Sequence, residues 1–74
     1  MKKLLDFLGA LEDKHIYYQL SRIRDSVMVE ISVPGERWEV EFFEDGHVEV
    51  EKFLSEGTIW PESELDVLFA KFSV

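Results

Sequence analysis

The 74-residue sequence contains no cysteine and only two prolines. The absence of cysteine excludes disulfide bridges, cysteine metal ligands and thiol catalysis, and it suits a reducing compartment. No apolar run approaches the roughly 18 residues that a membrane span needs. Lys2 and Lys3 resemble the start of a signal peptide, but Asp6 and Glu12 interrupt the apolar run that follows. We therefore expect one soluble cytoplasmic domain over residues 1–74.

Basic residues are scarce, with eight against sixteen acids and a net charge of −8. Residues 1–35 hold five acids and five bases and sum to zero, so the whole excess lies in residues 36–74. Such a field repels nucleic acid and anionic membranes and attracts a basic partner. The alternative interpretation is that the acids only keep a small domain in solution.

Apolar residues at helical spacing predict a helix at each end of the sequence, over residues 2–14 and up to about residue 72. The two apolar stripes consist of Leu4, Phe7, Leu8 and Leu11, and of Leu65, Leu68, Phe69 and Phe72. The second helix begins either with Pro61 in its first turn or with Ser63 as its cap. His15 follows the first helix at the end where a positive charge is favourable, and we expect it to cap that helix.

Gly9 stands inside the first predicted helix. A glycine there costs about 1 kcal/mol relative to alanine. Our hypothesis is that Gly9 lets this helix approach a sheet closely.

Strict alternation of apolar and polar residues predicts four antiparallel strands between the helices, each with one buried face. A slip of one residue turns a strand over, so the loops must keep the apolar residues on one side. We predict turns at residues 25–26, 34–37 and 44–46. The corresponding registers place Leu20 opposite Ile31, Val33 opposite Trp38, Val29 opposite Phe42 and Phe42 opposite Val48.

The alternation changes after Val50, where Lys52 would point inward and Phe53 outward. We expect the strand to end there or to contain a bulge, followed by a turn at residues 55–57. The resulting fold class is α+β in the order α-β-β-β-β-α, a four-stranded antiparallel meander with both terminal helices packed on one face. Trp38 and Trp60 are expected in the core.

The predicted register places glutamates opposite each other on the outer sheet face, Glu41 opposite Glu49 and Glu39 opposite Glu51. Like charges directly opposite each other destabilise a sheet. Glutamates that are retained despite this cost indicate a negative surface that docks a basic protein, with apolar contacts beside the acids. The candidate partner-binding residues are Glu30, Glu39, Glu41, Phe43, Glu49 and Glu51, with Tyr17, Met28 and Phe53 as further apolar contacts. The alternative is that the glutamates only solubilise the sheet and discourage edge pairing.

A second hypothesis is a metal-binding or small enzyme site around His47 and Glu49, since crowded carboxylates suit hard cations. Residues two apart on a strand are separated by roughly 6.5–7 Å, and a flat sheet does not wrap an ion. The sequence contains no calcium loop, zinc motif or nucleophile motif, so we predict no catalytic residue and no cofactor. A third hypothesis is a homo-oligomer, in which an edge-to-edge dimer is favoured over contact between two acidic faces; the alternative is a monomer.

Residues 34–51 contain the run RWEVEFFEDGHVEVE. This run resembles a strand-turn-strand segment of small uncharacterised bacterial proteins, and the resemblance implies no activity, ligand or catalytic residue. Acidic α+β proteins of this size also include toxin-immunity proteins and other inhibitors. This analogy of size and charge favours an inhibitor-like or antitoxin-like interaction module.

Overall fold

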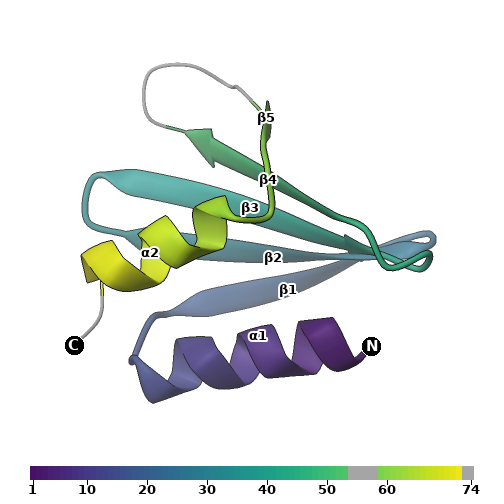
Figure 1. Ribbon diagram of the computed structural model, residues 1–74, viewed down its shortest axis with the longest axis horizontal. Coiled ribbons are helices and arrows are strands. Elements are labelled where there is room, and N and C mark those ends of the chain that lie inside the picture. Colours follow the sequence, from purple (N-terminus) through teal and green to yellow (C-terminus); the bar gives the residue numbers. More distant parts are fainter. Residues whose placement is uncertain (54–58, 73–74) are drawn as a thin grey trace.

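The computed structural model describes residues 1–53 and 59–72 and arranges them as one antiparallel sheet with two helices (Figure 1). The elements are α1 (Lys2–Asp13), β1 (Tyr18–Ile23), β2 (Ser26–Val33), β3 (Glu36–Phe43), β4 (Val48–Phe53), β5 (Ile59–Trp60) and α2 (Glu64–Phe72). The strands follow each other across the sheet in the order β1-β2-β3-β4-β5. The α+β class is confirmed. The two-residue β5 is an addition that the sequence did not predict, and the expected turn at residues 55–57 lies outside the described residues.

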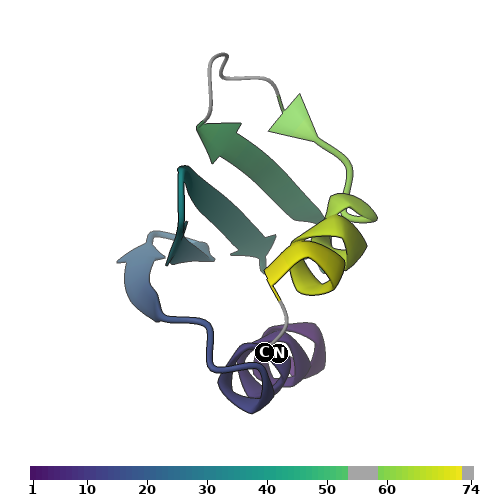
Figure 2. The same cartoon turned by 90° about the vertical axis from the view of Figure 1, so that its left-hand side faces the viewer.

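Both helices lie on the same side of the sheet (Figure 2). Phe7 of α1 joins the two layers, because its ring centroid lies 5.4 Å from that of Phe42 in β3 and 5.7 Å from that of Phe69 in α2. The buried apolar residues around this contact are Leu4, Phe7, Leu11, Ile16, Val29, Ile31, Trp38, Val40, Phe42, Val50 and Leu68. One continuous core therefore separates an inner, helix-covered face of the sheet from an outer face without helices.

The end of α1 is set by the backbone of His15. This residue has a φ of 59°. Its N–H donates to the carbonyl of Glu12 at 3.2 Å, and the N–H of Ile16 donates to the carbonyl of Leu11 at 2.9 Å. This pattern is a Schellman motif, in which a left-handed residue satisfies the last helical carbonyls. The prediction that His15 caps the helix is confirmed, and its left-handed backbone conformation makes the cap.

The hairpin between β3 and β4 has the predicted register and the predicted three-residue turn. Phe42 lies opposite Val48, and the N–H of Phe43 donates to the carbonyl of His47 at 3.0 Å across the turn. The last turn residue, Gly46, has a φ of +98°, a conformation that suits glycine. This turn fixes which side chains of β3 and β4 share a face.

The first hairpin turns at residues 24–25, so the predicted turn at residues 25–26 is wrong. The first residue of the observed turn has a φ of 46°. As a result Leu20 lies opposite Val29 and not opposite Ile31. The shift is two residues, so every side chain of β1 keeps its predicted face.

The second hairpin also differs from its prediction by two residues. Its turn contains only residues 34–35, in place of the predicted 34–37, and Val33 lies opposite Glu36 in place of Trp38. The glycine of this turn has a φ of +77°, which a two-residue hairpin accommodates. The prediction failed because it assigned the charged Glu36 to a loop, whereas the structure turns its side chain inward.

Strand β4 continues past Val50 in regular register, so the predicted strand end or bulge is wrong. Lys52 is only 9% exposed and lies opposite Trp38 on the inner face. Its Nζ lies 4.1 Å from the ring centroid of Trp60 and 2.6 Å from Oε2 of Glu64. A buried ammonium group is tolerated where a carboxylate pairs with it and aromatic faces cover it.

Glu36 forms a second inward-facing ion pair with α2. Its carboxylate accepts hydrogen bonds from Nε1 of Trp38, at 2.8 Å, and from Nζ of Lys71. Burial raises the pKa of Glu36, but the hydrogen bonds from Lys71 and Trp38 outweigh it and hold the pKa below its ordinary value. Two ion pairs therefore hold α2 on the sheet, and α2 begins at Glu64, directly after Ser63.

A methyl group added at Gly9 would meet no atom within 4 Å, so the hypothesis of a close helix–sheet approach is wrong. We predict that Gly9→Ala raises the free energy of unfolding by about 0.5–1 kcal/mol, because alanine favours the helix and loses less backbone entropy. Gly46→Ala is the matched control, since its site is equally open but has a φ of +98°. It should lower stability by about 1 kcal/mol. Urea unfolding measures both, and equal effects of the two variants would contradict the conformational argument.

We predict that Glu64→Leu lowers the free energy of unfolding by about 1–3 kcal/mol, because it leaves the buried ammonium group of Lys52 without its carboxylate. A second change, Lys52→Met, should restore most of the loss, since an apolar pair needs no compensation. Urea unfolding of the two single variants and the double variant forms a thermodynamic cycle. A double variant as unstable as Glu64→Leu would show that the pair contributes little.

Candidate functional site

The outer face of the sheet gathers all six residues that the sequence singled out. Glu39 of β3 lies between Glu30 of β2 and Glu51 of β4, directly opposite both, and Glu41 lies opposite Glu49. We use the name acidic face for the outward residues Glu30, Glu39, Glu41, Phe43, Glu49 and Glu51. The predicted opposition of glutamates is confirmed, and it extends over three strands.

Few cationic groups balance this face. Oε2 of Glu39 lies 3.5 Å from Nη2 of Arg37, and Glu41 accepts a hydrogen bond of 2.5 Å from Oγ of Ser26. Among the described outward residues of the strands, five carboxylates stand against the single guanidinium group of Arg37. Repulsion between opposed carboxylates therefore remains largely uncompensated.

Four of the five lysines form ion pairs with acids that lie outside the acidic face. These pairs are Lys2–Asp6, Lys3–Glu62, Lys52–Glu64 and Lys71–Glu36. The molecule thus places four lysine pairs on the helix side, whereas the described carboxylates of the acidic face have two longer contacts with basic groups, Glu39 with Arg37 and Glu49 with His47.

A shallow hollow of about 30 Å³ lies in the acidic face. Its lining consists of Met28, Glu39, Glu41, Glu49, Val50, Glu51 and Ile59. A space of this size holds a single water-sized group. The hollow thus combines carboxylates with apolar walls, of which Ile59, 59% exposed, belongs to the short strand β5.

His47 lies beside the acidic face, directly after the β3–β4 turn. Its ring stacks on Phe43 with centroids 4.1 Å apart and planes inclined by 7°. Its Nδ1 lies 2.6 Å from Oδ1 of Asp45, and its Nε2 lies 3.3 Å from Oε2 of Glu49. The hydrogen bond to Asp45, assisted by Glu49, raises the pKa of His47, and the backbone N–H and ring of His47 lower the pKa of Asp45.

The metal hypothesis around His47 and Glu49 gains no support from this arrangement. Both ring nitrogens of His47 already face carboxylates. Within residues 1–53 and 59–72, no group of three or more histidine, aspartate and glutamate side chains is placed to hold a metal ion. The two ring contacts make His47 part of a turn-stabilising cluster.

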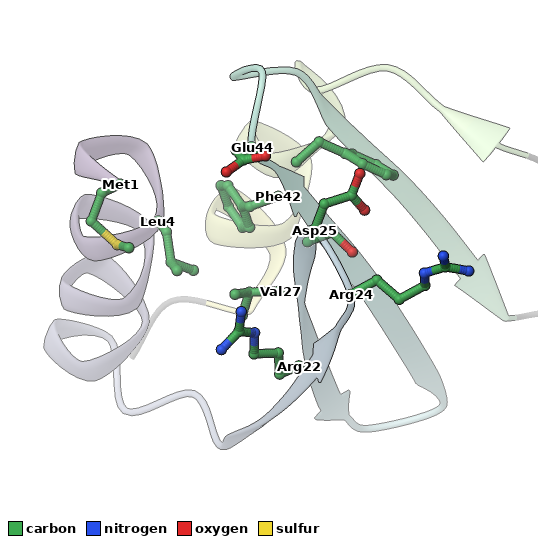
Figure 3. Close-up of a pocket in the computed structure, with 10 residues that line it drawn as sticks. Met1, Leu4, Arg22, Arg24, Asp25, Val27, Phe42 and Glu44 are labelled. Carbon is green, nitrogen blue, oxygen red and sulfur yellow. The ribbon is translucent and has the colours of Figure 1, made fainter.

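A cleft of about 520 Å³ opens between the start of α1 and the strand ends of the sheet (Figure 3). Met1, directly before α1, and Leu4 of α1 face Phe42 and Val27 across it, and Arg22 extends from β1 toward this gap. Phe43 is the one acidic-face residue that lines the cleft. The cleft therefore opens on the inner side of the sheet and leaves β1 thinly covered by α1.

Comparisons with protein-family models, curated proteins and solved structures found no match to this chain. In the part of the chain that the structure describes, no helix is long and apolar enough to cross a membrane. The functional argument therefore depends on the geometry and charge of the described residues.

Two contributors to the acidic face were missed at the level of sequence. Ser26 was placed in a turn, but it begins β2, and its hydroxyl group orients Glu41. Ile59 reaches the face because β5 pairs with β4 opposite Glu51. The apolar pair Ile59–Trp60 before Pro61 was the available signal for a short strand.

We predict that an NMR titration of the His47 ring gives a pKa above the ordinary 6.5. Asp45→Asn should move the value down toward 6.5, and Glu49→Gln should move it less, because the bond to Asp45 is the larger cause. Because the pKa of His47 is raised in the folded state, protonated His47 stabilises the fold fully below pH 6.5, and this stabilisation is lost as the pH rises through the raised pKa. A pKa unchanged by Asp45→Asn would contradict the geometry.

Proposed function

We propose that the protein is a non-catalytic interaction module whose acidic face binds a basic surface of a partner protein, as an inhibitor or antitoxin does. The observation that carries the proposal is the opposition of glutamates across β2, β3 and β4, in which five carboxylates outnumber the basic groups near them. Placing like charges directly opposite each other costs stability, and a cationic partner would remove that cost on binding. The proposal sets the protein in the cytoplasm, where a domain without disulfides suits the reducing conditions.

The hollow defines how a basic side chain would dock. Its volume of about 30 Å³ matches an ammonium group. Met28 and Ile59 at its wall would contact the methylene groups of a lysine, while the carboxylates surround the charge. Phe43, stacked on His47, offers an aromatic surface at the margin of the same face.

The charge separation between layers supports the same function. Because four of the five lysines pair on the helix side, an approaching cationic protein competes on the acidic face, among the described residues, with Arg37 at Glu39 and with His47 at Glu49. Complementary fields of this kind accelerate association and weaken as salt rises. Nucleic acid and anionic membranes would be repelled.

We predict that replacing Glu39, Glu41, Glu49 and Glu51 together by glutamine abolishes capture of basic proteins from extracts of the native cell. The matched control replaces four acids outside the acidic face, Asp13, Asp25, Glu44 and Asp66, by their amides and removes the same charge. The control should retain capture at low salt, and the unmodified protein should lose it at high salt. Equal capture by both variants would refute the proposal.

The same glutamine variant should have a free energy of unfolding about 0.5–1 kcal/mol higher than the unmodified protein, because it removes like-charge repulsion from the sheet. The gain should shrink at high salt, where repulsion is screened. Urea unfolding at two salt concentrations measures this effect without a partner. A variant with a lower free energy of unfolding would show that the glutamates stabilise the sheet, which would contradict the argument that their opposition costs stability.

A further inference from the structure

Among the described strands, β1 has β2 as its one neighbour, so its other edge, six residues long, has no partner strand there. Figure 2 shows it at the margin of the sheet. The opposite edge is protected, because β5 has two residues and is followed directly by Pro61, which has no N–H to donate. The fold thus blunts one edge and exposes the other.

The exposed edge carries few of the features that prevent strand pairing. β1 contains no proline, lysine or bulge, and Arg22 is its single charged residue. Leu20 is 51% exposed on the inner face, and Ile23 is 41% exposed on the outer face. A regular edge strand with free backbone groups and two exposed aliphatic side chains is a template for another strand.

The register identifies the backbone groups that face outward at this edge. Ile23 and Ser26 flank a two-residue turn, and residues in that position exchange both backbone hydrogen bonds. Bonded and non-bonded pairs alternate along an antiparallel ladder. The N–H and carbonyl groups of Tyr18, Leu20 and Arg22 therefore point away from β2 toward the free edge.

We propose that β1 pairs antiparallel with β1 of a second copy of this chain, about a two-fold axis at Leu20. In this register Leu20 lies opposite Leu20 of the second copy, and Tyr18 lies opposite Arg22. All three residues are those with free backbone groups, so each pair exchanges both hydrogen bonds. The contact covers the exposed leucine with its own counterpart.

Charge complementarity favours a second copy over another strand. Arg22 has no ion pair within residues 1–53 and 59–72, and in the dimer it faces the ring of Tyr18. The hydroxyl group of Tyr18 donates a 2.5 Å hydrogen bond to Oε2 of Glu12, so the carboxylate of Glu12 lies beside the ring that Arg22 of the second copy would face. Residues 1–35 also sum to zero charge, which allows the two edges to approach without the repulsion of the acidic halves.

The geometry of the dimer follows from its axis. A two-fold axis that pairs edge strands antiparallel in one continuous sheet stands perpendicular to that sheet. Both acidic faces then lie on the same side and both helix layers on the other. The dimer does not depend on the proposed function, but it would double the width of the acidic surface.

Sedimentation velocity over a wide range of concentration tests the assembly. The unmodified protein should show a reversible dimer, and Leu20→Lys, which sets two like charges against each other on the axis, should weaken it about tenfold or more. Val67→Lys is the matched control, since it changes an exposed aliphatic residue of α2, and it should leave the dimer intact. A monomer at all concentrations, or a dimer that survives Leu20→Lys, would overturn the proposal.

Amide hydrogen exchange and charge reversal test the register. The amides of Tyr18, Leu20 and Arg22 should exchange slowly in the dimer and quickly in Leu20→Lys, whereas that of Ser21, bonded to β2, should stay protected in both. Arg22→Glu should weaken the dimer, and Glu12→Arg in the same chain should restore it. Fast exchange of the three amides in a dimeric sample would place the interface elsewhere and contradict the proposal.

Discussion

The register between β3 and β4 is the constraint on which both faces of the molecule depend. Gly46 closes the turn with a positive φ, and the turn places Phe42 opposite Val48 on one side and Glu41 opposite Glu49 on the other. The core contact of Phe7 with Phe42 and the opposition of the glutamates are therefore two results of one turn. A slip of one residue would bury carboxylates under α1 and expose the core, which burial energetics forbid.

Alternation in the sequence was sufficient to assign faces but not registers. A face depends on whether a residue has an odd or even position, and a shift of two residues leaves it unchanged. The first two hairpins contain such shifts, because their turns lie at residues 24–25 and 34–35 and not at the predicted 25–26 and 34–37. The acidic face was predictable because it needs only the parity and the β3–β4 turn. The two-residue shift of the second hairpin left Glu30 on the outer face but moved it from the predicted position opposite Glu41 to one opposite Glu39.

The inward charges were not predictable from local pattern. Lys52 and Glu36 occupy inner positions because partners in α2, far along the chain, neutralise them: Lys52 pairs with Glu64, and Glu36 pairs with Lys71. A rule that places every charged residue outward predicts a strand end at Lys52 and a loop at Glu36. The local sequence pattern does not show how α2 packs. This packing brings a carboxylate and an ammonium group to the sheet, and without these partners burial would exclude the inward charges. The same packing directs β5 and Ile59 to the acidic face.

These inward pairs also explain why the acidic face is so poorly compensated. The ion pairs of α2 engage Lys52 and Lys71, and a chain with sixteen acids and eight bases has few cations left for the sheet. The docking of α2 therefore creates the charge asymmetry as it completes the core. Because the neutral half of the chain supplies α1, β1 and β2, the acidic charge is sparsest at the β1 edge and densest over β3 and β4. Strand pairing at β1 and cation binding at the acidic face consequently use regions that do not compete, and association through one would leave the other open.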